Sequence, residues 1–310
     1  MSTTFCLQSR LTAHNGVGLV VDVSEGGADT PADGARLDVN VQAGGPDGLI
    51  KPSQLWQAVR DADFPGYFNI VSLQKATDGN PLVMDIAGIR SASDMRDGVD
   101  VVAFRQHSGF HDNQLWTISL DPGAVVNDGS GESAFRINYF LIESKLTTSS
   151  GLPYVLDVQG WEPGHSPALG TFLDAFHKKS TDNQLWQMDF PFGPPNTSPE
   201  IGFFSFDPAT ESVTVGGSGF RPAQTLALGS ALVVQGGQDP ALQVTPQLAL
   251  TDLGGVFSAT ASLADWGFGL GDEGEFTVTA SDNQNGTNSP FIAQGSRTWG
   301  ANGIPQFTNG

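Results

Sequence analysis

Asp112-Asn113-Gln114-Leu115-Trp116 is repeated without change as Asp182-Asn183-Gln184-Leu185-Trp186, and a shorter copy, Gln54-Leu55-Trp56, comes earlier in the chain. The three tryptophans are separated by 60 and then by 70 residues. Repetition of this kind indicates a structural unit that is used several times. All three copies lie in the first 190 of 310 residues. We therefore predict a threefold domain followed by a different one.

Each repeat also contains three short runs rich in β-branched and aromatic residues, with Asn-Gly or Asp-Gly turns after the first run in repeats one and two. Such runs around a tight turn predict β-hairpins, because Gly and Asn tolerate positive φ. With the strand that carries Gln-Leu-Trp, four strands per repeat give twelve, and they must share one core because a lone hairpin is marginal in water. The predicted runs are Thr4–Leu11, Leu19–Val23, Arg36–Val41, Tyr67–Leu73, Leu82–Ile86, Val99–Phe104, Phe135–Ile142, Tyr154–Val158 and Thr171–Phe176.

The composition limits the partners. A net charge of -19, with only 14 Lys and Arg residues, argues against nucleic acid and anionic membrane surfaces, which need basic side chains. No apolar run is long enough to span a bilayer. Cys6 is the single cysteine, so no intrachain disulfide can form. Met1–Leu11 lacks the pattern of an ordinary signal peptide, which predicts a cytosolic protein or export by another route.

Motifs of catalysis are not evident. The chain has no Gly-x-Ser-x-Gly elbow, no His-Glu-x-x-His helix motif and no phosphate-binding loop. We therefore expect a protein that is not an enzyme and that uses no metal or cofactor. Acidic pairs are abundant in a chain with 33 Asp and Glu residues, so a glycosidase-like carboxylate pair stays open as an alternative.

Three repeats, each with an Asp after an apolar run and a final Gln-x-Trp, resemble the ricin-type β-trefoil lectins over residues 1–190. The resemblance implies a β-trefoil that binds glycans of the galactose or N-acetylgalactosamine type. The Gln and Trp residues of the motif are interpreted as structural, since a buried indole needs a partner for its N–H. They are Gln54, Trp56, Gln114, Trp116, Gln184 and Trp186.

In that family three elements of each repeat contact the sugar. An Asp after the second strand accepts hydrogen bonds from sugar hydroxyls, although a turn-capping role would also explain it. An aromatic ring at the end of the third strand stacks on the sugar, although such a ring is also a common core residue. An Asn precedes Gln-Leu-Trp. The matching residues are Asp22 in repeat one, Asp85, Phe104 and Asn113 in repeat two, and Asp157, Phe176 and Asn183 in repeat three.

Repeat one departs from this pattern. It has Ser53 in place of the Asn and offers Val39 or Val41 where the ring is expected. We therefore expect repeats two and three to bind and repeat one to be inactive. His107 and His177 follow the aromatic residues and are predicted to line the two pockets, with His111 as a further candidate.

The chain after residue 190 has a different character. Residues 191–200 are rich in proline and are predicted to be a linker. Seven short apolar runs within 201–310 predict a β-sandwich. They are Ile201–Phe206, Ser212–Val215, Thr225–Val234, Leu242–Thr245, Val256–Leu263, Glu275–Ala280 and Pro290–Ala293. Val213–Pro222, with Gly217-Ser218-Gly219-Phe220-Arg221-Pro222, and Gly274–Ala280 resemble bacterial immunoglobulin-like domains. That resemblance implies a role in assembly, presentation or homodimer formation.

Three functions follow. The first is a carbohydrate-binding lectin that uses repeats two and three. The second is a non-catalytic receptor-binding or scaffold component of a toxin or surface assembly, which would recognise protein. The third is a glycoside hydrolase-like enzyme.

Overall fold

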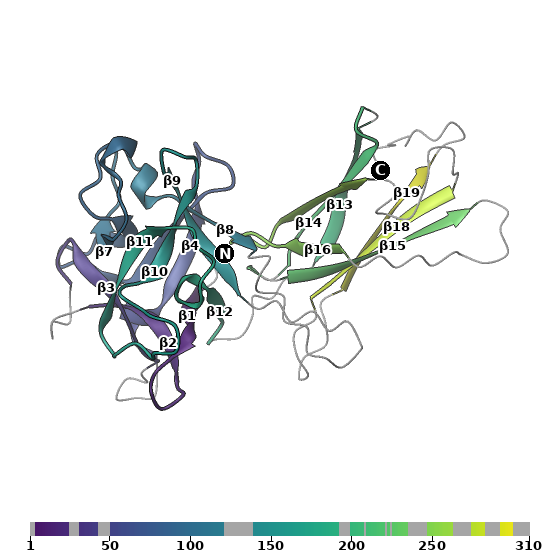
Figure 1. Ribbon diagram of the computed structural model, residues 1–310. Coiled ribbons are helices and arrows are strands. Elements are labelled where there is room, and N and C mark those ends of the chain that lie inside the picture. Colours follow the sequence, from purple (N-terminus) through teal and green to yellow (C-terminus); the bar gives the residue numbers. More distant parts are fainter. Residues whose placement is uncertain are drawn as a thin grey trace. The chain divides into compact units, whose positions relative to one another are not determined.

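The computed structural model describes residues 4–24, 31–42, 50–120, 139–191, 199–207, 209–220, 222–223, 225–234, 247–262, 274–282 and 292–299. The chain forms two compact units, residues 1–195 and 196–310 (Figure 1). Their described residues form β-strands and a few short 3₁₀ turns, which confirms the prediction of an all-β protein. Of the predicted linker, residues 192–198 lie outside the described part, and Glu200 already begins a strand.

The first unit contains four strands for each repeat among its described residues, twelve in all. Each final strand begins at the Trp of the motif and follows a 3₁₀ turn, η1 (Pro52–Gln54), η3 (Asp112–Gln114) or η5 (Asp182–Gln184). The strands are β1 (Thr4–Thr12), β2 (Gly18–Val23), β3 (Ala35–Val41), β4 (Trp56–Arg60), β5 (Phe68–Lys75), β6 (Pro81–Ile86), β7 (Val99–Arg105), β8 (Trp116–Leu120), β9 (Phe140–Thr147), β10 (Pro153–Val158), β11 (Thr171–His177) and β12 (Trp186–Asp189).

One predicted strand was misplaced. The opening strand of repeat three is β9, Phe140–Thr147, and not Phe135–Ile142. Residues 135–138 alternate apolar and polar types and run into the apolar stretch 139–142, so the sequence pattern favoured the earlier start. The structure pairs Phe140 with Trp186, which sets the position of the strand. Residues 135–138 lie outside the described part.

The first and last strands of the repeats form a closed ring. β1 pairs with β4, β4 with β5, β5 with β8, β8 with β9, β9 with β12, and β12 with β1, all antiparallel. A closed barrel has no exposed sheet edge. The other strands form three hairpins, β2–β3, β6–β7 and β10–β11, whose second strands β3, β7 and β11 pair with one another. A six-stranded barrel with three mutually paired hairpins is the arrangement of a β-trefoil.

Phenylalanine and tryptophan fill the same place in every repeat. The Trp of each motif lies opposite the Phe that opens its own repeat, as Phe5 with Trp56, Phe68 with Trp116 and Phe140 with Trp186. These six side chains are almost completely buried. Large aromatic groups contribute much of the apolar area that a core removes from water. The Trp residues are therefore core residues, as predicted.

The same motif joins each repeat to the next. Trp56 pairs with Ser72, Trp116 with Ser144, and Trp186 with Ser9 of repeat one. Beside each pair the Leu of the motif accepts a main-chain hydrogen bond from the next repeat, at 2.8 to 2.9 Å. The last of these bonds runs from Arg10 to Leu185 and closes the ring of repeats.

The second unit consists of two sheets. β13 (Glu200–Asp207), β14 (Ser212–Ser218) and β17 (Phe257–Ser262) form one, and β16 (Gln247–Leu250), β15 (Thr225–Val234), β18 (Gly274–Asp282) and β19 (Ile292–Trp299) form the other. Buried residues of both sheets share one core. The prediction placed a strand at Leu242–Thr245, which lies outside the described residues, and missed β16. Whether these sheets make an immunoglobulin-like domain stays a prediction.

The first prediction concerns Gly255, in the tight turn before β17. Gly255 has φ +75°, and an added Cβ would lie 2.1 Å from the main-chain oxygen of Phe220. Gly255→Ala should therefore lower the free energy of unfolding by about 3 kcal/mol or more, because backbone strain adds to a main-chain clash. Thermal unfolding of the intact protein measures it. Gly202→Ala, where a Cβ meets nothing within 4 Å, is the control and should change little. Equal effects of the two variants would contradict the proposed clash.

Candidate functional site

The Gln-Leu-Trp motif fixes an aspartate at the end of the second strand of its own repeat. The indole N–H of the Trp donates to the main-chain oxygen of the residue before that Asp, at 3.4, 2.9 and 3.0 Å in repeats one to three. The Nε2 of the Gln donates to the Asp carboxylate, at 2.9, 2.6 and 2.9 Å. The three pairs are Gln54 with Asp22, Gln114 with Asp85, and Gln184 with Asp157.

The same Gln also holds the end of the third strand. Its Nε2 makes a second bond to a main-chain oxygen there, that of Val41, Arg105 or His177, at 3.0 to 3.1 Å. In repeats two and three its Oε1 accepts main-chain N–H groups of the following loop, from His107 and from Lys179. The Gln side chains therefore join the second and third strands of each repeat and position the carboxylate of each candidate site.

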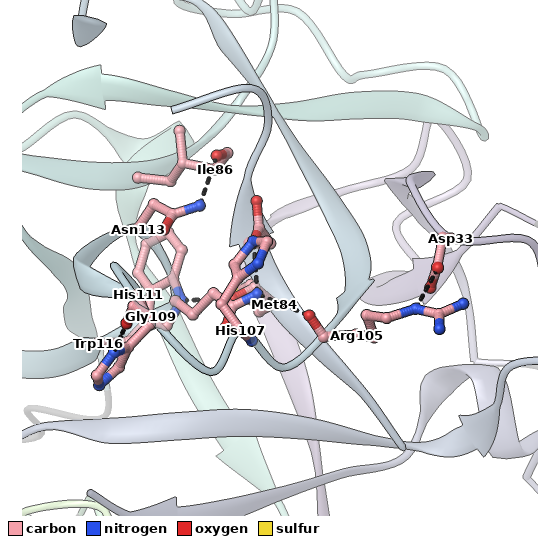
Figure 2. A network of polar contacts seen from close by, with 11 residues as sticks. Asp33, Met84, Ile86, Arg105, His107, Gly109, His111, Asn113 and Trp116 are labelled. Carbon is pink, nitrogen blue, oxygen red and sulfur yellow. Dashed lines mark hydrogen bonds and ion pairs between the residues drawn. The ribbon is translucent and has the colours of Figure 1, made fainter. Parts of the chain in front are cut away.

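In repeat two the carboxylate of Asp85 is 2% exposed. Besides the amide of Gln114, it has the Nε2 of His107 3.3 Å away. Asn113 donates to the main-chain oxygen of Ile86 at 3.1 Å, and its own Oδ1 has no hydrogen-bond partner among the described residues (Figure 2). The structure thus brings Asp85, His107 and Asn113 together, and their role in binding stays a prediction.

In repeat three Asn183 bonds the Asp directly. Its Nδ2 donates to Oδ1 of Asp157 at 2.6 Å and lies 3.3 Å from the main-chain oxygen of Val158. The Oδ1 of Asn183, a residue that is 7% exposed, has no partner in the described structure. A depression of about 260 Å³ opens here. It is lined by Asp157, Gly160, Trp161, Pro163, Asp174, Phe176, Lys179, Thr181 and Asn183.

The two predicted aromatic rings are half-buried and already in contact with basic or imidazole side chains. Phe104 stacks on His107, with ring centroids 5.3 Å apart. The Nζ of Lys179 lies 4.0 Å from the ring centroid of Phe176. A sugar that stacked on either ring face would have to share it with that neighbour or displace it.

Six of the nine residues that line the repeat-three depression were not predicted, and Trp161 and Asp174 are two of them. Trp161 lies in the loop after β10, and its indole N–H donates to the main-chain oxygen of His165 at 2.7 Å. Asp174 lies opposite Asp157 on the paired strand β11. Counting residues back from Gln-Leu-Trp located neither of them. Trp161 lies in a loop of variable length, and the position of Asp174 depends on the register between β10 and β11. A lone Trp in a Gly- and Pro-rich loop was the signal available for the first.

The register corrects the prediction for repeat one. Phe104 lies opposite Val83 and Phe176 opposite Val155, and the matching residue opposite Val20 is Asn40. The predicted alternatives, Val39 and Val41, are one place to either side of it. No aromatic ring occupies this position, as expected. Asp38, which lies opposite Asp22, corresponds to Asp174 of repeat three.

Burial raises the pKa of four aspartates in these hairpins above the ordinary value of 3.8. The pKa of Asp85 and of Asp157 rises to about 6 mainly because of burial, against the hydrogen bonds from their Gln partners. Burial and the charge of Asp22 raise the pKa of Asp38 to about 6. Asp174 has the highest pKa, about 7, because of burial and the charges of Asp157, Asp100 and Asp97.

The remaining histidines point elsewhere. His177 pairs with Asp97, with its Nδ1 at 2.8 Å, and is not among the residues that line the depression. His111 is 3.5 Å from the carboxylate of Asp61 and also contacts Gly109 (Figure 2). Among the residues that the structure describes, no three His, Cys, Asp or Glu side chains are grouped so that they could hold a metal ion.

The sequence matches no protein-family model. It also matches no curated protein. Solved structures similar to this chain include ThreeFoil, a designed threefold symmetric protein, with a TM-score of 0.38, 24% identity, and coverage of 60% of this chain and 96% of that one. A ricin B-like lectin from Macrolepiota procera in complex with lactose has a TM-score of 0.38, 18% identity, and coverage of 61% and 96%.

A mosquitocidal holotoxin has a TM-score of 0.40 and 10% identity over 99% of this chain, which spans 34% of that chain. All three TM-scores lie below 0.5, so the architecture is assigned from the strand pairing described above. Within the described part of the chain, no helix is long and apolar enough to cross a membrane.

Gln114→Met tests the link between motif and carboxylate. The variant removes both donor bonds of the amide and its acceptor bond from His107, and it leaves the buried Asp85 without its amide partner. The free energy of unfolding should fall by about 3 kcal/mol or more. Chemical denaturation measures it. Gln57→Met, at a half-buried position with one side-chain bond to Thr4, should cost about 1 kcal/mol or less. Similar costs for the two would show that the Asp85 bond contributes little.

The raised pKa values predict the dependence of stability on pH. A carboxyl with a pKa of about 7 in the folded state and near 3.8 when unfolded binds its proton more tightly in the folded state. Stability is therefore highest at the acidic end and falls as the pH rises from about 4 to 7. The melting temperature should drop between pH 5 and pH 8. The aspartates with lowered pKa, such as Asp61, lose their contribution only below this window.

Asp174→Asn tests whether Asp174 causes this dependence of stability on pH, as opposed to repulsion among all the acidic side chains. The variant cannot ionise at this position, so its melting temperature should fall less over the same range and should exceed that of the wild type at pH 8. Asp182→Asn removes the same charge from a half-exposed side chain and should keep the wild-type slope. Identical slopes for wild type and Asp174→Asn would mean that Asp174 titrates like an exposed carboxyl.

Proposed function

We propose that the first unit is a carbohydrate-binding domain whose working sites are in repeats two and three. The sites comprise Asp85, Phe104, Asn113 and His107 in repeat two, and Asp157, Phe176 and Asn183 in repeat three. Through the resemblance to ricin-type lectins, glycans of the galactose or N-acetylgalactosamine type are the proposed ligands. The proposed activity is binding without catalysis.

One observation carries the proposal. Asp157, Phe176 and Asn183, chosen from three separate segments of sequence, line the same depression of about 260 Å³. Its volume is just below the roughly 300–1,000 Å³ of typical small-molecule sites, which fits one sugar ring. The carboxylate and the free amide oxygen of Asn183 offer acceptors to hydroxyl groups, and the rings of Phe176 and Trp161 offer apolar faces.

Repeat two supports a second, different site. Asp85 and Asn113 are held by the same kinds of bond as in repeat three, and Asn113 also has an unpaired amide oxygen. His107 contacts the carboxylate there, whereas the matching position in repeat three is filled by Lys179 over its ring. Two weak sites on one domain raise the affinity for a multivalent glycan without any new contact.

For the second unit we propose a role in assembly or presentation, including homodimer formation. It has a mainly apolar depression of about 400 Å³ along β13, β14 and the start of β17. Phe203 and Val256 line it with exposed fractions of 54% and 39%. Recognition of a protein partner is the alternative function, and binding to cells that soluble sugars do not compete would favour it.

A glycan array with the intact protein tests the main proposal. The wild type should bind terminal galactose or N-acetylgalactosamine, and Asn183→Ala and Asn113→Ala should each lose part of the signal. The double variant should bind about 100-fold more weakly or not at all, because both sites and the avidity between them are lost. Circular dichroism and the melting temperature show whether each variant is folded.

Ser53→Ala is the matched control. Ser53 occupies the position of the Asn in repeat one, which we propose is inactive, so its removal should leave the array unchanged. A wild type that binds no glycan, or variants that bind as well as the wild type, would rule out the proposed sites. Loss of binding in Ser53→Ala alone would move the site to repeat one.

A further inference from the structure

We propose that the repeat-three site selects a sugar that carries a protonated amine, a 2-amino-2-deoxyhexose, and that Asp174 is the counter-charge to that amine. This rests on the proposed carbohydrate-binding function and adds the class of ligand. The inference concerns Asp174 on β11, which pairs with Asp157 on β10 of the same hairpin.

The two carboxylates at this site are not equivalent. Both oxygens of Asp157 have amide donors, from Asn183 at 2.6 Å and from Gln184 at 2.9 Å. Asp174 is 4% exposed, and its Oδ1 has no partner among the described residues. The Oδ1 of Asn183 is the second unpaired acceptor on the same depression. Each is a buried acceptor without a donor among the described residues, which a ligand group with several N–H bonds would satisfy.

Two basic side chains lie near Asp174, and each already has another partner. Arg36 on β3 bonds Asp100 at 2.6 Å and lies 3.5 Å from the ring centroid of Phe172. It lowers the pKa of Asp174 only in part. Among the described residues that line the depression, Lys179 is the one that is basic, and its Nζ lies over Phe176.

The remaining charges around Asp174 are acidic or already paired. Asp100 on β7 pairs with Asp174 on β11, and the carboxylate of Asp97 is paired with His177. Their negative charges, with that of Asp157, act against ionisation of Asp174. The site therefore holds more negative charge than its own basic residues balance.

A neutral sugar would leave that charge buried and unbalanced. Hydroxyl groups can donate to both acceptors, but they add no positive charge, whereas an ammonium group supplies three donors and cancels one carboxylate. Aromatic faces such as those of Trp161 and Phe176 also attract a cation, as the position of Lys179 already shows.

The other repeats provide comparisons within the chain. In repeat two the residue opposite Asp85 is Val102, so that site has a single carboxylate and suits a neutral sugar. Repeat one has the same pair, Asp22 and Asp38, but Asn40 donates to Asp38 at 2.9 Å and takes the place of the aromatic ring. Asp38 is thus a matched control for Asp174.

The test compares galactosamine with N-acetylgalactosamine and galactose on the full chain at pH 7. Acetylation keeps the ring and removes the positive charge. Titrations followed by NMR report affinity and location together, through the indole N–H signal of Trp161, assigned with Trp161→Phe. Galactosamine should shift that signal with an affinity at least about tenfold higher than either neutral sugar, the order of a partly buried ion pair. The preference should shrink at high salt.

Asp174→Asn should abolish the preference, so that galactosamine binds no more tightly than the neutral sugars, while Asp38→Asn should keep the preference. Equal or tighter binding of the neutral sugars to the wild type would overturn this inference and leave the proposed function intact. So would a preference that survives in Asp174→Asn. Binding of no sugar at all would overturn the proposed function and this inference together.

Discussion

The amide of the Gln in each Gln-Leu-Trp motif donates one hydrogen to a buried Asp carboxylate and the other to the main chain at the end of the third strand. A buried carboxylate is costly unless it is hydrogen-bonded, so this bond is what allows an Asp at that place. The same amide ties together the second strand, the third strand and the turn before the fourth. Fold and candidate site therefore depend on one side chain, and no repeat can lose its Gln without disturbing both.

The Trp at the end of each motif connects its own repeat to the next one. It lies opposite the Phe that opens its own repeat and opposite a Ser that belongs to the next, and the third Trp returns to Ser9 of repeat one. Each of these serines accepts a main-chain N–H two residues further on. A single repeat thus lacks one of the two strand partners of its Trp. The three must fold as one body, and this is the physical reason for exact repetition of the motif in a chain whose loops differ.

The sequence predicted those features of the candidate site that are local and repeated. Gln-Leu-Trp set the positions of Asp85, Asp157, Asn113 and Asn183, and the structure brings each Asp and Asn together because they are joined through the motif. The sequence could not predict contacts that depend on the register between strands. Asp174 carries no motif of its own, and its place opposite Asp157 follows from a turn of variable length. Asn40 was missed by one residue for the same reason, and β9 was placed too early because residues 135–138 alternate apolar and polar types ahead of the apolar stretch 139–142.

The position opposite the repeated carboxylate differs in chemistry between the repeats. Asp38, Val102 and Asp174 fill it, although the Gln amide, the Trp indole and the main-chain pairing around it are the same in every repeat. Because the motif takes its partners from the second strand and from the end of the third, this side chain can change without breaking any bond of the frame. A buried charge there costs stability by itself, as the raised pKa of Asp174 shows. A ligand of opposite charge would recover that cost on binding, so the frame permits each repeat its own specificity.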